Sequence, residues 1–147
     1  MSSNNKSLDD LILPIDGPVP ILIPDGDYDA TVTNMQKVVR FGRPMLDFSF
    51  TVVTDPYAGV VLPAFTVLGR SGAIPPSSKI SRWWMLIAQF EQYARRDRVA
   101  LRTFKSFLFQ VQVDTVARDH QHRPLPKAHH HSVVREIIAV VGRIKKS

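Results

Sequence analysis

The stretch MLDFSFTVV, residues 45–53, has the strictest alternation of apolar and polar residues in the chain. Leu46, Phe48, Phe50 and Val52 occupy every second position, and small or charged polar residues lie between them. Successive side chains of a β-strand point to opposite faces of the sheet, so this pattern predicts a strand with one buried and one solvated face.

Similar patterns on both sides extend the prediction to five strands. DYDATVTNM, from Asp27, and FLFQVQVDTV, residues 107–116, alternate in the same way, and VVREIIAVV, residues 133–141, is rich in β-branched residues. VVRFGRP is expected to hold the first turn, and DPYAG the second, with Pro56 at the second turn position. VVLPAFTVL follows, and its Pro63 predicts an edge strand or a bulge.

The apolar period changes from two to 3.6 after the loop GRSGAIPPSSK. Ser77 or Ser78 is a suitable N-cap for a helix, and the cation-rich segment ARRDR suits its C-terminal end. The expected buried stripe of this helix comprises Ile80, Trp83, Trp84, Ile87, Phe90 and Ala94.

Three strands, one helix and two strands predict an all-β fold with one helix, namely a five-stranded Greek-key OB-fold barrel. The helix lies between the third and fourth strands and is expected to plug the bottom of the barrel. A looser α+β sandwich is the alternative. We expect an extended Pro-rich N-terminal arm at residues 1–24, the OB-fold domain at 25–142 and a short basic tail at 143–147.

Composition narrows the class of protein. The 147 residues suffice for one domain, and their 44% hydrophobic content is normal for a globular protein. We expect a cytoplasmic protein with no membrane segment, because no apolar run is long enough to span a bilayer, the N-terminus lacks a signal sequence, and cysteine is absent.

The net charge of +6 is unevenly distributed. Residues 1–55 hold eight acidic and four basic residues, whereas residues 56–147 hold five acidic and fifteen basic ones. A basic surface concentrates polyanions around it, and nucleic acid is the commonest polyanion in a cytoplasm. The alternative is a solvated basic face with no partner.

The segments IPDGDYDATV, RPMLDFSFTVVTDPYAGVVLPAF and FKSFLFQVQVDTVARD resemble small phage and mobile-element proteins of the single-stranded DNA-binding, OB-fold type. The shared features are a Gly-x-Tyr start to the first strand, a Pro-Tyr-x-Gly turn, and an apolar strand after the helix; the resemblance covers roughly residues 22–142. It implies an accessory protein that binds single-stranded DNA during replication or recombination, beside a helicase, polymerase or recombinase. The polar outward face of the second strand (Asp47, Ser49, Thr51) departs from the aromatic platform that such proteins often carry.

OB-folds bind oligonucleotides across the second and third strands, between the loops that join strands one and two and strands four and five. Both loops are basic here, and we expect cations to contact phosphates while exposed rings stack on bases without reading sequence. We also expect a homo-oligomer, because one OB domain covers only a few nucleotides. The predicted nucleic-acid-binding residues are Lys37, Arg40, Phe41, Arg43, Tyr57, Phe65, Arg70, Arg118, His120, His122, Arg123 and Lys127. Burial of Phe41, Tyr57 or Phe65 is the alternative for each ring.

The segment HRPLPKAHHH, residues 122–131, is interpreted as the tip of the second binding loop. A zinc site is the alternative, but His120, His122 and the run His129–His131 lack an ordered ligand spacing. Another alternative is that this segment only connects the two strands of a hairpin. We predict no cofactor, no metal and no catalytic residue, because phosphate-loop, metalloprotease, nucleophile-elbow and dinucleotide motifs are all missing. The alternative function is a structural or assembly protein of a phage or mobile element that uses the barrel and the arm for protein contacts.

Overall fold

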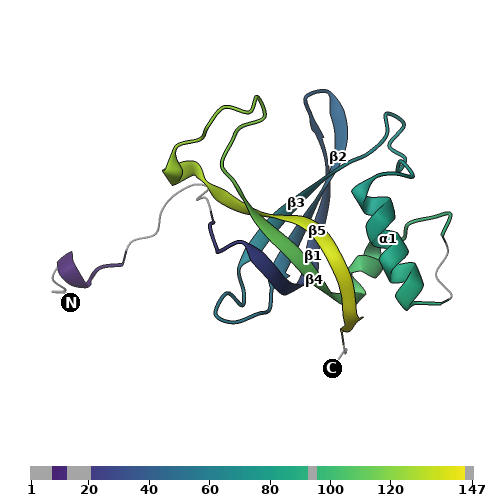
Figure 1. The fold of residues 1–147 in the computed structure, drawn as a ribbon, viewed down its shortest axis with the longest axis horizontal. Coiled ribbons are helices and arrows are strands. Elements are labelled where there is room, and N and C mark those ends of the chain that lie inside the picture. Colours follow the sequence, from purple (N-terminus) through teal and green to yellow (C-terminus); the bar gives the residue numbers. More distant parts are fainter. Residues whose placement is uncertain (1–7, 13–20, 93–95, 145–147) are drawn as a thin grey trace, which may run out of the picture.

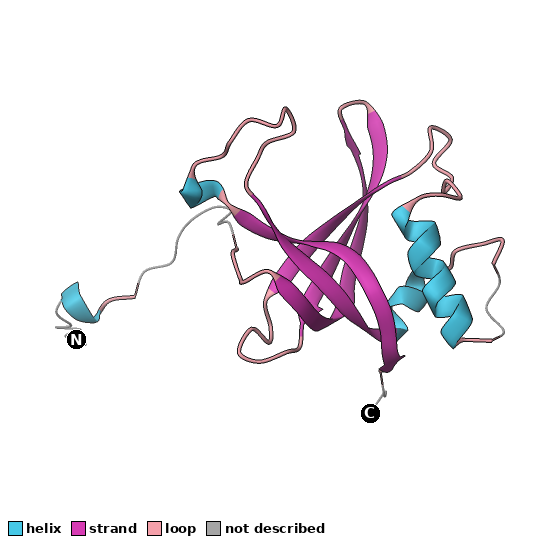
Figure 2. Cartoon of the chain, viewed as in Figure 1, coloured by secondary structure: helices cyan, strands magenta, loops and turns pink. Residues whose placement is uncertain are grey.

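A computed structural model describes residues 8–12, 21–92 and 96–144 of the chain. Figure 1 shows a twisted antiparallel sheet with one α-helix beside it, and Figure 2 separates the strands from the long loops at their ends. The strands are β1 (Gly26–Arg40), β2 (Arg43–Val52), β3 (Val61–Val67), β4 (Phe107–Val116) and β5 (His131–Arg143), and the helix is α1 (Lys79–Phe90). Short 3-10 helices occupy Leu8–Asp10, Leu101–Ser106 and Lys127–His129.

The predicted element order, three strands, a helix and two strands, is confirmed. The strand order in the sheet is β3-β2-β1-β4-β5, with every neighbouring pair antiparallel. The edge strands β3 and β5 approach each other, but within the described residues no backbone ladder joins them. The sheet is therefore open, and the predicted closed barrel is not observed. Pro63 lies on edge strand β3, as predicted, and its missing N–H reduces the bonding capacity of that strand.

The first hairpin is longer than the sequence pattern indicated. Val38, Val39 and Arg40 were expected in a turn, but β1 continues through them because β-branched residues fit a pleated strand. Only Phe41 and Gly42 form the turn, with φ angles of 53° and 70°. Two central residues with positive φ are the signature of the tight turn whose twist matches a β-hairpin. The first part of β1 pairs with β4 and the rest pairs with β2 alone, so the hairpin tip extends beyond β4.

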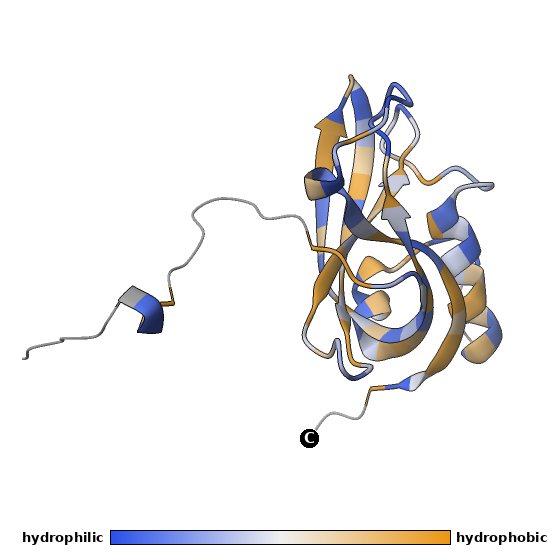
Figure 3. Ribbon diagram, turned by 60° about the vertical axis from the view of Figure 1, so that its left-hand side comes forward, coloured by the Kyte–Doolittle hydropathy of each residue, from blue (hydrophilic) through white to orange (hydrophobic). Residues whose placement is uncertain are grey.

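The core lies between the sheet and α1. Hydrophobic and hydrophilic residues alternate along the strands in Figure 3, and Leu46, Phe48, Phe50 and Val52 of β2 are all buried, as predicted. The ring of Trp83 packs edge-on against Phe48 and Phe50, with centroids 5.4 and 6.2 Å apart. This arrangement packs the ring of Trp83, which is fully buried, against two core residues of β2.

The helix begins where the sequence indicated and ends earlier. Ser78 is the N-cap, and its hydroxyl accepts a hydrogen bond from the Ser81 backbone N–H at 3.3 Å. Ile80, Trp83, Trp84 and Ile87 are buried, but α1 ends at Phe90, which is partly exposed. Ala94, the last residue of the predicted stripe, lies outside the described residues. In the described part of the chain no helix has the length and apolarity to cross a bilayer.

Hydrogen bonds between Ile21 and Ile23 of the N-terminal arm and Ser132 of β5 join the arm to the sheet. Ile23 is buried, its N–H donates to the Ser132 hydroxyl at 2.9 Å, and that hydroxyl donates to the Ile23 carbonyl at 3.1 Å. The Ser132 N–H also donates to the Ile21 carbonyl at 2.7 Å. Leu11, Ile12, Ile21 and Leu22 are exposed. Residues 1–7 and 13–20 of the predicted arm, and 145–147 of the predicted tail, lie outside the described residues.

Candidate nucleic-acid interface

Phe41 occupies the tip of the β1–β2 hairpin and is 80% exposed. Its φ of 53° belongs to the left-handed region, where a bulky side chain is uncommon and the backbone costs about 1–2 kcal/mol. Glycine at this position would remove the cost. An exposed aromatic ring held in a costly backbone conformation is therefore a candidate contact for a ligand.

A shallow groove runs along the outward face of the hairpin below this tip. Met45 pairs with Val67 and Asp47 pairs with Phe65 across β2 and β3, so these side chains share one face. We call this surface the hairpin groove; it is lined by Arg40, Phe41, Arg43, Met45, Phe65, Val67 and His120. Its lining combines three aromatic rings, two of phenylalanine and one of histidine, with two guanidinium groups, which suits a flat, hydrophobic ligand that carries negative charge.

Arg40 is held in place inside the hairpin groove. Its two terminal nitrogens donate to the two carboxylate oxygens of Asp47 at 2.6 and 2.5 Å, and its guanidinium carbon lies 5.1 Å from the centre of the Phe65 ring. The hydrogen bonds to Asp47 raise the pKa of Arg40 above its ordinary value. The guanidinium group of Arg40 therefore lies over Phe65 with its charge balanced by Asp47, and it is not free to bind a phosphate.

The β4–β5 loop is organised around Asp119. One of its carboxylate oxygens accepts hydrogen bonds from the backbone N–H groups of Gln121 and Arg123, both at 2.9 Å, and the other accepts from the Arg123 side chain at 3.1 Å. The hydrogen bond from the Arg123 N–H is the first cause that lowers the pKa of Asp119 from its ordinary value. His122 adopts a φ of 63° in this turn, and its carbonyl accepts a hydrogen bond from Arg118 at 3.1 Å. The loop is therefore a defined turn.

The two predicted binding loops meet at one point. The rings of Phe41 and His120 lie 4.9 Å apart, centre to centre, at an angle of 34°. These residues belong to the β1–β2 hairpin and the β4–β5 loop, so the lining of the hairpin groove includes a residue from each loop. An aromatic pair at this distance contributes about 0.5–1.5 kcal/mol beyond the burial of its surface.

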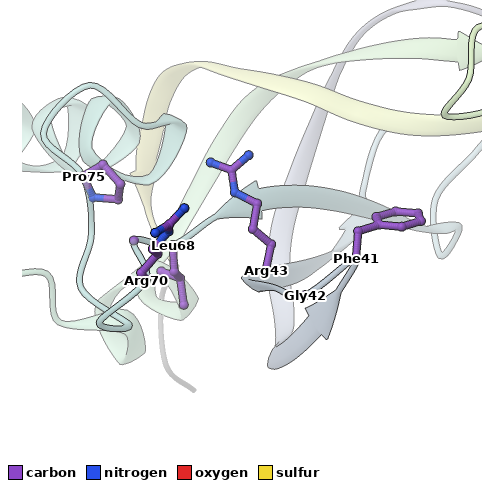
Figure 4. A pocket seen from close by; sticks show the side chains of 7 residues that line it. Phe41, Gly42, Arg43, Leu68, Arg70 and Pro75 are labelled. Atoms are coloured by element: carbon purple, nitrogen blue, oxygen red, sulfur yellow. The ribbon is translucent and has the colours of Figure 1, made fainter.

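A second hollow adjoins the hairpin groove and shares Phe41 and Arg43 with it. We call it the loop pocket; it is lined by Phe41, Gly42, Arg43, Leu68, Gly69, Arg70 and Pro75. In Figure 4 the Arg43 side chain stands between Phe41 and the pair formed by Leu68 and Arg70. Neither Arg43 nor Arg70 makes an ion pair with any described residue, and both are exposed. They are cations available to an external anion.

The predicted binding residues fall into four groups, of which Tyr57 forms the last. The first lines the hairpin groove or the loop pocket and comprises Arg40, Phe41, Arg43, Phe65, Arg70 and His120. Lys37 lies nearby, because its ammonium group would be 3.2 Å from a Cβ placed on Gly72 in the loop after β3. The remaining loop residues lie outside both hollows and comprise Arg118, His122, Arg123 and Lys127.

Tyr57 lies apart from both hollows. It follows the C-terminal end of β2, whereas the hairpin tip precedes its start, and a ten-residue strand spans about 30 Å. Its ring packs edge-on against Tyr28 at 5.8 Å. Its N–H donates to the Thr54 carbonyl at 3.0 Å, so Pro56 is the third turn residue rather than the second, with a cis peptide bond.

The histidines do not converge. His130 contacts the Leu125 carbonyl at 3.1 Å, His131 contacts the His129 carbonyl at 3.0 Å, and His120 faces Phe41. Among the described residues, three or more metal-ligating side chains gather at no point.

Met45, Val67, Leu68 and Pro75 line the two hollows and were not among the predicted site residues. The alternation of β2 contains the signal for Met45, because residues 43, 45 and 47 share one face of a strand. The role of Asp47 as the partner of Arg40 depends on strand register, which composition does not reveal.

Comparisons with protein families, with curated proteins and with solved structures found no match for this chain.

Proposed function

We propose that this protein binds unpaired nucleic acid, single-stranded DNA first, with little sequence preference. The observation that carries the proposal is the meeting of Phe41 and His120 beside the free cations Arg43 and Arg70. Every base can stack on an aromatic ring, whatever the sequence, and every phosphate carries negative charge. The rings and cations of this surface are complementary to both.

The strand order supports the proposal. The first three strands are consecutive neighbours and β4 lies beside β1, and we propose that this order is that of a Greek key. A helix between β3 and β4 is the position that it takes in an OB-fold, where the β2–β3 face and the β1–β2 and β4–β5 loops hold the oligonucleotide. We therefore propose an OB-fold barrel whose edge strands β3 and β5 lie close together without a ladder.

In the proposed mechanism each group has one task. Arg43 and Arg70 neutralise phosphates, Phe41 stacks on a base, and the Arg40–Phe65 pair offers a second flat surface. Stacking contributes about 1–3 kcal/mol per base, whichever base it is. No step of chemistry is needed, so we propose a non-enzymatic, oligomeric accessory protein of a phage or mobile element that acts in replication or recombination in the cytoplasm.

A titration with fluorescent oligo-dT tests this proposal. We expect binding at low salt and a log–log slope against salt of about −0.7 per phosphate neutralised. The double variant Arg43→Ala/Arg70→Ala should bind at least about tenfold more weakly, a loss of about 1.4 kcal/mol. Arg135→Ala/Arg143→Ala is the matched control, since it removes the same charge from cations that are already paired with Asp114 and Glu91. Equal losses in the two double variants would contradict a specific interface.

The second candidate is a structural or assembly protein. Ile138, Val141 and Ile144, on and just after β5, are exposed apolar residues that suit a protein contact. Absence of oligo-dT binding at low salt, together with self-association that Val141→Asp abolishes, would favour this function over the first.

A further inference from the structure

A third hollow, which the binding site above does not include, lies beside α1. We call it the helix-side groove; it is lined chiefly by Ile74, Ser81, Trp84, Arg96, Arg98 and Val99. It is bounded by the loop between β3 and α1 and by the segment that follows the helix. The sequence motifs singled out none of these residues as functional.

The groove carries a positive charge over an apolar floor. Arg96 and Arg98 are exposed and form no ion pair with another described residue, and the lining also includes one acidic residue, Asp97. Ile74 and Val99 are half-buried, and Trp84, although it is buried, also lines the groove. Two guanidinium groups on an apolar floor suit a sugar–phosphate backbone better than a neutral ligand.

This groove adjoins the loop pocket. Pro75 lines the loop pocket, while its two chain neighbours, Ile74 and Pro76, line the helix-side groove. The loop that separates the two hollows is a compact turn, in which the Gly69 N–H donates to the Ala73 carbonyl at 2.7 Å and Gly72 has a φ of 82°. Lys37 from the hairpin packs against that turn at Gly72.

Four cations that are unpaired among the described residues therefore line two adjoining hollows: Arg43 and Arg70 line the loop pocket, and Arg96 and Arg98 line the helix-side groove beyond the same loop. We propose that the helix-side groove is a second binding site for the phosphate backbone, occupied by the same unpaired strand after it leaves the hairpin groove. This inference rests on the proposed function. It assigns the strand a course toward α1, so that the histidine run is not part of the path.

The test compares a short oligo-dT of about 6 nucleotides with a long one of about 20 nucleotides, lengths that bracket typical site sizes. We expect Arg96→Ala/Arg98→Ala to weaken binding of the long oligonucleotide about tenfold and to reduce the steepness of its salt dependence by about 1.4, corresponding to two phosphate contacts. Binding of the short oligonucleotide should be unchanged, because it fits within the hairpin groove and the loop pocket. Arg135→Ala/Arg143→Ala again controls for net charge, and thermal unfolding controls for folding.

Tryptophan fluorescence gives a second readout, because Trp84 lines the helix-side groove and Trp83 is enclosed in the core. The long oligonucleotide should change the emission of the wild-type protein, and Trp84→Phe should abolish that change. Equal effects of Arg96→Ala/Arg98→Ala on both lengths, or effects no larger than those of the control, would overturn the second site while leaving the proposed function intact. Failure of the wild-type protein to bind either length would overturn both.

Discussion

The ring of Phe41 lies 4.9 Å from the ring of His120, although the two residues belong to different hairpins of the sheet. Phe41 keeps a left-handed backbone at this contact, and its ring remains 80% exposed. The contact joins the two loops through side chains alone. In the proposed function, the exposed part of this ring stacks on a base.

Phe41→Gly should separate stability from binding. Glycine adopts a positive φ at little cost, so the free energy of unfolding is expected to rise by up to about 1 kcal/mol. Loss of the ring should weaken oligo-dT binding about tenfold, since stacking on a base contributes about 1–3 kcal/mol. Urea denaturation and fluorescence anisotropy measure the two effects. Phe41→Trp, which keeps a stacking ring, is the control and should retain affinity; a similar loss in both variants would mean that the ring does not stack.

Asp47→Asn should release Arg40. The ion pair is partly exposed, with side chains 38% and 18% accessible, so its loss should cost at most about 1 kcal/mol of stability. Binding should become several-fold tighter, because the groove loses a negative charge and Arg40 becomes free to contact a phosphate. Anisotropy titrations at two salt concentrations measure this gain. Asp27→Asn, at the exposed start of β1, removes the same charge far from the tip and should leave the affinity unchanged.

Acidification should reduce the stability of the turn in the β4–β5 loop. The pKa of Asp119 is held below its ordinary value of 3.8, so its ionised form stabilises the folded turn above pH 3.8. That stabilisation is lost as the pH falls through the lowered pKa, because the protonated carboxyl no longer attracts the N–H groups of Gln121 and Arg123. An NMR titration of the Asp119 carboxyl carbon measures the shift.

Arg123→Ala distinguishes the causes of that shift. The variant keeps the backbone N–H of residue 123, which is the largest contribution, and removes the side-chain hydrogen bond. We therefore expect the pKa of Asp119 to rise only part of the way toward 3.8. A complete return to the ordinary value would show that the guanidinium group, not the backbone, dominates.

Ser132→Ala should loosen the N-terminal arm. The hydroxyl is buried and both accepts from and donates to the backbone of Ile23, so its removal leaves a buried N–H without a partner. A loss of about 1–3 kcal/mol in the free energy of unfolding is expected. Faster hydrogen exchange at Ile23 would place the change at this contact. Ser49→Ala, on the outward face of β2, is a control that should have little effect.

The spacing of apolar residues in the sequence was enough to predict the strands and the helix of this protein. The alternation in residues 45–53 placed Leu46, Phe48, Phe50 and Val52 in the core, and the change of period placed Trp83 and Trp84 on a buried helical stripe. These predictions succeeded because side-chain direction in a strand or helix follows from spacing along the chain. Boundaries were less certain, as the end of α1 at Phe90 and the extension of β1 to Arg40 show.

Tertiary structure alone decided which charged residues remain available to a ligand. The sequence presents Arg40, Arg43, Arg70 and Arg123 as equivalent cations, yet Arg40 pairs with Asp47 and Arg123 with Asp119, while Arg43 and Arg70 stay unpaired among the described residues. The tertiary structure also places Tyr57 away from the site and His120 against Phe41. Within the described part of the chain, the strands β3 and β5 share no backbone ladder. Each of these outcomes depends on strand register and on contacts between distant segments, which the spacing of residues within one segment does not encode.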